Sequence, residues 1–90
     1  MDINYDRLPS HMQDSARRYM EHGHPVGDFL TFVMENDLCH AFVKADDINT
    51  MAMREWAAFL YNAPGKSWGS PEKVREWQAH NGLAGPDNNK

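Results

Sequence analysis

One stretch limits what this chain can fold into: residues 46–62, the longest uninterrupted helical pattern in the sequence. It begins with Asp46 and Asp47, whose carboxylates can accept hydrogen bonds from the free N–H groups of a first helical turn. It ends at 62–65, where a proline and a glycine stop a helix. We therefore predict one continuous helix over 46–62.

The apolar positions of this stretch follow the 3.6-residue period but cover more than one narrow stripe. They are Ile48, Met51, Ala52, Trp56, Phe59 and Leu60, and Met53 and Ala57 widen the band. A helix this apolar needs neighbours on more than one side, so we predict that it is the central helix of a small bundle.

Four further helices are expected around it. They run from Pro9 or Ser10 to Gly23, from Pro25 or Val26 through Met34, from Asp37 to Lys44, and from Ser70 to Asn81. Composition alone also allows a strand over 29–33, but the pattern continues through Met34 without the alternation of a strand. The predicted fold class is all-α, a compact bundle of four or five short helices.

Residues 1–90 are expected to form a single domain with one core. The lead-in 1–6 is predicted to be flexible unless Ile3 and Tyr5 find a groove, and the polar tail 84–90 is predicted to be flexible. The core is predicted to include Met12, Phe29, Leu30, Val33, Phe42, Met51, Trp56, Phe59, Leu60, Val74 and Trp77.

Charge and cysteine usage limit the class of partner. Nine basic and thirteen acidic residues give a formal charge of −4, which argues against nucleic acid and suits a basic partner. Cys39 is the single cysteine, and its place beside Leu38 and Ala41 predicts a buried thiol in a reducing cytosol. No signal peptide or membrane span is recognised, so we expect a cytoplasmic protein with no membrane partner.

A metal site is the first chemical alternative. His22 and His24 flank a glycine, and two helices folding back could bring Cys39 and His40 beside them. The paired spacing of structural zinc sites is missing, and adjacent helical residues point about 100° apart. A turn with solvated histidines is therefore the favoured interpretation, with no cofactor.

No pattern in the chain identifies a reaction. Gly65-Lys66-Ser67 resembles the end of a phosphate-binding loop, but Leu60 stands where the earlier glycine is required. Cys39 and His40 diverge on a helix and therefore do not form a nucleophile and base. We expect a protein that is not an enzyme.

Two groups of residues could instead contact a partner. Tyr61, Lys66 and Trp68 lie along the loop after the central helix, where rigid aromatic side chains make good binding anchors. The alternative, which we favour for Trp68, is that it folds back on the core. Arg17 and Arg18 offer a small basic patch, although such a patch is more often a solvated helix face.

Two sequence strings stand out, namely Tyr-x-Glu-x-Gly-x-Pro-x-Gly-x-Phe-Leu at 19–30 and Phe-Leu-Tyr-Asn at 59–62, together with the segments 7–14, 36–38, 45–49 and 69–71 and with Trp77. Through these residues the chain resembles, over about 7–83, a family of small, uncharacterised proteins encoded by bacteriophages and prophages. The resemblance implies expression in a bacterial host cytoplasm and carries over no catalytic residues.

This context favours a protein-binding protein that acts on a host or phage protein or complex. Inhibition of a host defence system, in the manner of an anti-CRISPR protein, is the sharpest form of that hypothesis. A phage regulatory or nucleic-acid-handling accessory protein and a small metal-binding protein are the alternatives. A homodimer is also possible, because the wide apolar band of the central helix could face a second copy.

Overall fold

The computed structural model describes residues 3–85, and the regular secondary structure of this part of the chain is all helical, without a strand. It contains α1 (Ser10–His22), α2 (Asp28–Met34), α3 (Leu38–Lys44), α4 (Asp47–Met51), α5 (Met53–Asn62) and α6 (Pro71–Ala79), with 3-10 turns η1 (Gly65–Ser67) and η2 (Gly82–Ala84). The all-α prediction is confirmed. Residues 1–2 and 86–90, which belong to the segments predicted to be flexible, lie outside the described residues.

Three helix ends lie where the local sequence predicts them, but the predicted start of the second helix at Pro25 or Val26 is wrong, because α2 begins at Asp28 after an extended Gly27. Gly23 closes α1 in the left-handed conformation (φ 68°), which costs glycine little because it has no Cβ. Asp37 caps α3 by accepting the backbone N–H of His40 at 3.3 Å. Ser70 caps α6 by accepting the N–H of Lys73 at 3.1 Å, and Pro71 follows at the first helical position.

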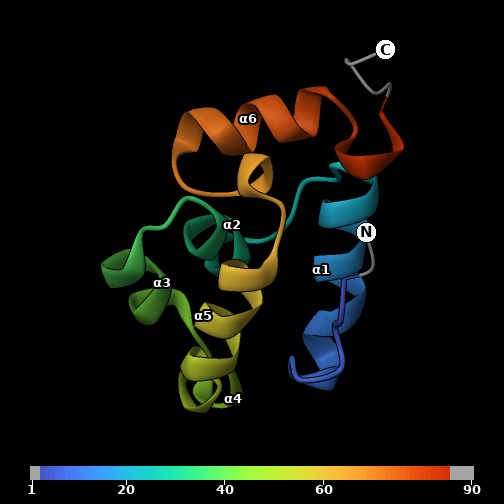
Figure 1. Cartoon of the computed structure of the whole chain (residues 1–90). Coiled ribbons are helices and arrows are strands. Elements are labelled where there is room, and N and C mark those ends of the chain that lie inside the picture. Colours follow the sequence, from blue (N-terminus) through green and yellow to red (C-terminus); the bar gives the residue numbers. More distant parts are fainter. Residues whose placement is uncertain (1–2, 86–90) are drawn as a thin grey trace.

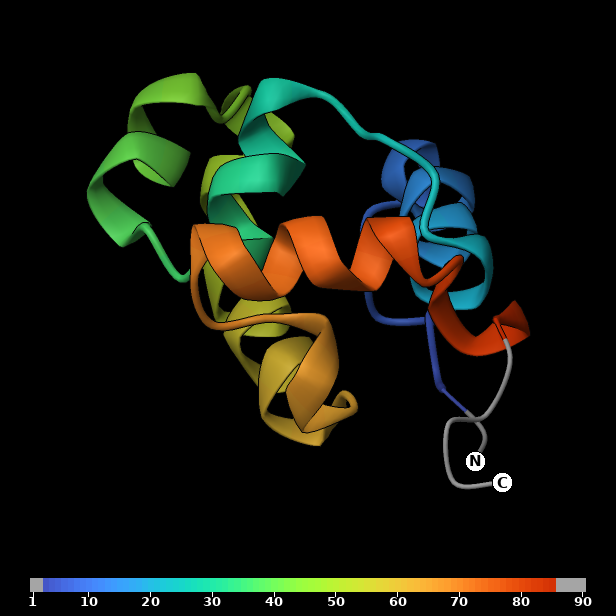
Figure 2. The ribbon, with the colours of Figure 1, turned by 90° about the horizontal axis from the view of Figure 1, so that it is seen from above.

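The helices surround one core (Figure 1). Seen from above, α6 passes over α2 and reaches the end of α1 (Figure 2). The Cα radius of gyration of 12.3 Å is close to the roughly 12 Å expected for a compact chain of this length. In Figure 1, α4 and α6 lie at opposite ends of the molecule.

Most of the predicted core is confirmed. Phe29, Leu30, Val33, Trp56, Phe59, Leu60, Val74 and Trp77 are buried, and Met12 is half-buried against them. Tyr5 from the lead-in is also buried, with its ring centroid 5.7 Å from that of Phe59. Tyr5 therefore occupies a groove in the core, which is the condition under which the lead-in is predicted to be ordered.

The prediction of one continuous helix over 46–62 is wrong. The backbone departs from helical geometry at Ala52 (φ −101°, ψ 14°), which separates α4 from α5. The N–H of Ala52 is shared between the carbonyl oxygens of Ile48 and Asn49, each at 3.1 Å. Residues 3–85 therefore contain six α-helices, where the sequence predicts four or five.

A buried hydrogen bond accompanies this break. Trp56, which packs against Phe29 and Phe59 in edge-to-face geometry, donates its indole N–H to the side-chain oxygen of Asn49 at 3.0 Å. Asn49 is only 3% exposed, although it is polar. Burying an indole N–H without an acceptor costs free energy. The Asn49 oxygen supplies that acceptor, so Trp56 can be buried without this cost.

Three burial predictions are wrong. Met51 is 85% exposed and Phe42 is 44% exposed, because the break at Ala52 turns α4 outward and the short helix α3 buries only Ala41. Cys39 is exposed because it lies on the part of α3 that does not face the core.

We expect Asn49→Ala to lower the free energy of unfolding by about 1–3 kcal/mol, because it leaves the buried indole N–H of Trp56 without an acceptor. Chemical denaturation measures the change. Asn62→Ala is the matched control: Asn62 is exposed and donates only to the carbonyl of Ala58, so it should change stability by no more than about 0.5 kcal/mol.

A Trp56→Phe background separates this hydrogen bond from other effects of Asn49. With no indole N–H present, Asn49→Ala should cost less than it does in the wild-type chain. Equal costs in both backgrounds would contradict the role assigned to the hydrogen bond.

Candidate binding surfaces

The first candidate surface comprises the exposed apolar side chains of α3 and α4, two short helices that follow one another in the chain. We call it the acidic apolar end, and its large exposed apolar side chains are Leu38, Phe42 and Val43 on α3 and Ile48 and Met51 on α4. Scattered single apolar residues on a surface are ordinary, but five from two short helices of a small domain are not. This end is therefore a candidate interface.

The same segment carries the net charge of the protein. Residues 28–55 contain six acidic and two basic residues, which gives −4, and the remaining residues sum to zero. One of the two basic side chains, Lys44, lies 3.9 Å from the Asp28 carboxylate in an exposed pair. An exposed ion pair of this kind adds little stability, so Lys44 does little to offset the negative charge. Exposed apolar side chains and uncompensated negative charge therefore occur in the same segment.

Two carboxylates of this end are fixed by helix capping. Asp46 accepts the backbone N–H of Asn49 at 2.7 Å, and this hydrogen bond, followed by the contact with His11, holds the pKa of Asp46 below its usual value. The His11 ring nitrogen lies 3.0 Å from the other Asp46 oxygen. Asp37, which caps α3, lies 2.7 Å from His40 Nδ1 in the same way.

A shallow hollow of about 400 Å³ adjoins α4. Ile48 and Met51 form its apolar side, while Pro9 and Arg7 close it from the segment before α1. Glu55 also lines it. The exposed side chains of α4 thus border a depression that an apolar side chain of a partner could enter.

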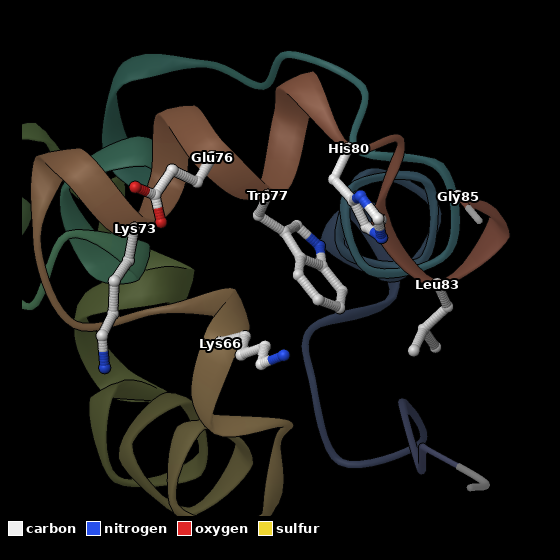
Figure 3. Close-up of a pocket in the computed structure, with 8 residues that line it drawn as sticks. Lys66, Lys73, Glu76, Trp77, His80, Leu83 and Gly85 are labelled. Atoms are coloured by element: carbon white, nitrogen blue, oxygen red, sulfur yellow. The ribbon is translucent and has the colours of Figure 1, made fainter. Parts of the chain in front are cut away.

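The second candidate surface is a hollow of about 570 Å³ between α6, η1 and η2, at the opposite end of the molecule (Figure 3). We call it the α6 hollow. It is lined by Lys66, Lys73, Glu76, Trp77, His80, Gly82, Leu83 and Gly85. This volume lies in the range of about 300–1,000 Å³ typical of small-molecule sites.

The loop residues predicted to contact a partner do not form one site. Lys66 lines the α6 hollow, but Tyr61 and Trp68 do not. Tyr61 is 87% exposed on α5, and Trp68 is half-buried against the core. The core role favoured for Trp68 therefore agrees with its position, while partner binding by these residues stays a prediction.

The two arginines of the predicted basic patch have partners within the chain. The Arg17 guanidinium lies 4.8 Å above the Tyr5 ring, and Arg18 pairs with Asp14 at 2.5 Å. Burial, and then the nearby Glu21, raise the pKa of Tyr5 to about 12, so its hydroxyl stays neutral beside Arg17. These contacts favour the interpretation of a solvated helix face.

The histidines and the cysteine of the metal alternative are not assembled into a site. His22 and His24 stack on each other with ring centroids 5.5 Å apart, whereas the His40 ring stacks on Phe32 at 5.1 Å. Within residues 3–85, no group of three or more histidine, cysteine or acidic side chains is placed to hold a metal ion. Among the described residues the geometry thus supplies no metal centre from His22, His24, Cys39 and His40.

Comparison with protein-family models, with curated proteins and with solved structures found no match. The resemblance to phage-encoded proteins therefore stays a prediction, as does the expectation that the chain is not an enzyme. In the described part of the chain, no helix is both long and apolar enough to cross a bilayer.

Acid should reveal the charged state of the Asp46 cap. A carboxylate whose pKa is lowered by folding stabilises the folded state above its unfolded pKa of about 4, and this contribution is lost as the pH falls through the folded pKa. Asparagine caps helices about as well as aspartate but does not titrate, so Asp46→Asn should remove that pH dependence.

Thermal unfolding of both proteins between about pH 5 and pH 2 measures this difference. We expect the melting temperature of the wild type to fall more steeply than that of Asp46→Asn. The other carboxylates are common to the two proteins and cancel in the comparison. Parallel curves would contradict the assigned role of Asp46.

Proposed function

We propose that this chain is a protein-binding protein that docks its acidic apolar end on a basic and apolar surface of a partner protein. The observation that carries the proposal is the coincidence, within residues 28–55, of five large exposed apolar side chains with the net charge of −4. Interfaces combine a desolvated apolar centre with charges that select and orient the partner.

Charge complementarity favours a different protein over a second copy of this chain. Two copies joined through the same face would bring two segments of charge −4 together, and like charges across an interface disfavour association. A partner with basic residues around an apolar centre would instead gain from both features. A homodimer through this end is thus the weaker form of the proposal.

The phage-like sequence strings support a bacterial host protein or complex as the partner. A small protein that acts by occupying a surface needs no catalytic residues, which agrees with the absence of a reaction motif in the sequence. Inhibition of a host defence complex, in the manner of an anti-CRISPR protein, remains the sharpest form of this proposal.

Affinity purification from bacterial lysate tests the proposal with two matched variants. Met51→Lys and Tyr61→Lys each replace one highly exposed apolar side chain, 85% and 87% exposed, by a lysine. We expect the wild type and Tyr61→Lys to retain the same partner and Met51→Lys to lose it. Raising the salt concentration from about 50 to 500 mM should weaken the capture, because exposed charges are screened.

Several outcomes would count against the proposal. A partner kept by Met51→Lys and lost by Tyr61→Lys would move the interface to the end of α5. Capture that is the same for all three proteins, or no capture at all, would remove the acidic apolar end as an interface. A dimer in light scattering that Met51→Lys dissociates would show that the occupant is a second copy.

A further inference from the structure

The α6 hollow has walls that are fixed by hydrogen bonds within the core. The Trp77 indole N–H donates to the backbone oxygen of Tyr19 at 2.9 Å, and the Tyr19 hydroxyl donates to the backbone oxygen of Ser67 at 2.6 Å. These two bonds connect α6 to α1 and α1 to η1. The hollow therefore lies between elements whose relative positions are set before any ligand arrives, which lowers the entropy cost of binding.

The far wall is held by a close backbone approach. Gly82 adopts φ +60°, and a Cβ on it would lie 2.7 Å from both the Gly23 nitrogen and the Met20 oxygen. Only glycine fits this contact, which places η2 against the end of α1. Leu83, the next residue, is thereby positioned as the wall of the hollow that faces Trp77 (Figure 3).

The charges around the hollow are unequal. Lys66 has no carboxylate within ion-pair distance among residues 3–85, and Figure 3 shows its ammonium directed toward Trp77. The Lys73 ammonium instead donates to the Gly65 carbonyl at 3.3 Å, and both Lys73 and Glu76 point away from Trp77. The formal charges of Lys73 and Glu76 cancel, so the lining carries a net charge of +1, and Lys66 is the charged residue directed toward Trp77.

The remaining lining is apolar and partly aromatic. The indole of Trp77 and the imidazole of His80 lie side by side in Figure 3, and the Leu83 side chain stands opposite them. Trp77 is 6% exposed, so only a small part of its indole reaches the hollow, while His80 is half-buried. Aromatic rings favour flat partners through edge-to-face or offset contacts, which demand no specific hydrogen bond. The lining thus suits a planar apolar body, and Lys66 suits one negative charge.

We propose that the α6 hollow is a binding site for small aromatic carboxylates, with the ring system against Trp77, His80 and Leu83 and the carboxylate on the Lys66 ammonium. A monoanion is favoured over a phosphate dianion because only one positive charge beside Trp77 is uncompensated and Glu76 lies at the rim. This site lies away from the acidic apolar end and does not depend on the proposed protein partner.

Titration of the full chain with 2-naphthoate, followed by NMR, tests this site. We expect the indole N–H signal of Trp77 and the methyl signals of Leu83 to shift, with a dissociation constant on the order of 0.1–1 mM for so small a ligand. The neutral isostere 2-naphthamide should bind about three- to tenfold more weakly, because it lacks the charge that Lys66 recognises.

Two variants divide the interaction into its charge and its apolar part. Lys66→Gln should weaken 2-naphthoate about three- to tenfold and leave 2-naphthamide unchanged, while Leu83→Ala should weaken both ligands. Lys44→Gln removes the same charge on α3, far from the hollow, and serves as the control that leaves both affinities unchanged. Circular dichroism and melting curves establish that each variant is folded.

The proposal is overturned if 2-naphthoate shifts neither Trp77 nor Leu83 at 10 mM, a concentration about tenfold above the weakest expected dissociation constant. It is equally overturned if 2-naphthoate and 2-naphthamide bind alike, or if Lys66→Gln and Lys44→Gln weaken 2-naphthoate to the same extent. Inorganic phosphate that binds more tightly than 2-naphthoate would show that the hollow selects a dianion, against the assignment made here.

Discussion

The hydrogen bond between the Trp56 indole and the Asn49 side chain is the constraint on which the rest of the structure depends. Trp56 is the largest fully buried side chain and contacts two other aromatic rings, so its polar N–H must find an acceptor inside the core. Asn49 supplies that acceptor from the turn before the break at Ala52. The polar requirement of one core residue is thus met by a side chain of α4, whose apolar residues Ile48 and Met51 are exposed.

The small size of the domain accounts for two features. They are the exposed apolar surface at one end and the preformed hollow at the other. A chain of 90 residues cannot cover every apolar side chain of six short helices. At the α3–α4 end the uncovered residues lie in the segment that carries the net negative charge, which suits a basic protein surface. Under α6 the core closes around Trp77 and leaves a hollow beside a single uncompensated lysine, which suits a small anion. The two surfaces differ in charge, shape and size, and therefore in the kind of partner that each can take.

Local sequence signals predicted the helices well, and long-range requirements account for what they missed. The caps Asp37 and Ser70 and the stop at Gly23 are short-range signals, and each was predicted correctly. The break at Ala52 was not predicted, because the apolar pattern continues through Ala52 and Met53 and no proline or glycine interrupts it there. The width of the apolar band over 46–62 was the sequence signal that some of its residues are exposed. A band that is too wide for one helix face leaves some apolar side chains uncovered. The concentration of charge in 28–55 could also have been found in the sequence. The α6 hollow could not, because it depends on the packing of η2 against α1.

The central claim, that α4 is a separate helix with its apolar side in solvent, is tested most directly by the accessibility of methyl groups to a soluble paramagnetic probe. Met51 and Met34 are the informative pair, since Met51 is largely exposed and Met34 is completely buried. The fold described here predicts strong relaxation of the Met51 methyl signal and none of the Met34 signal, with the Trp56 indole N–H also protected. A Met51 methyl as protected as that of Met34 would mean that α4 continues into the core as one helix with α5, and it would remove the acidic apolar end.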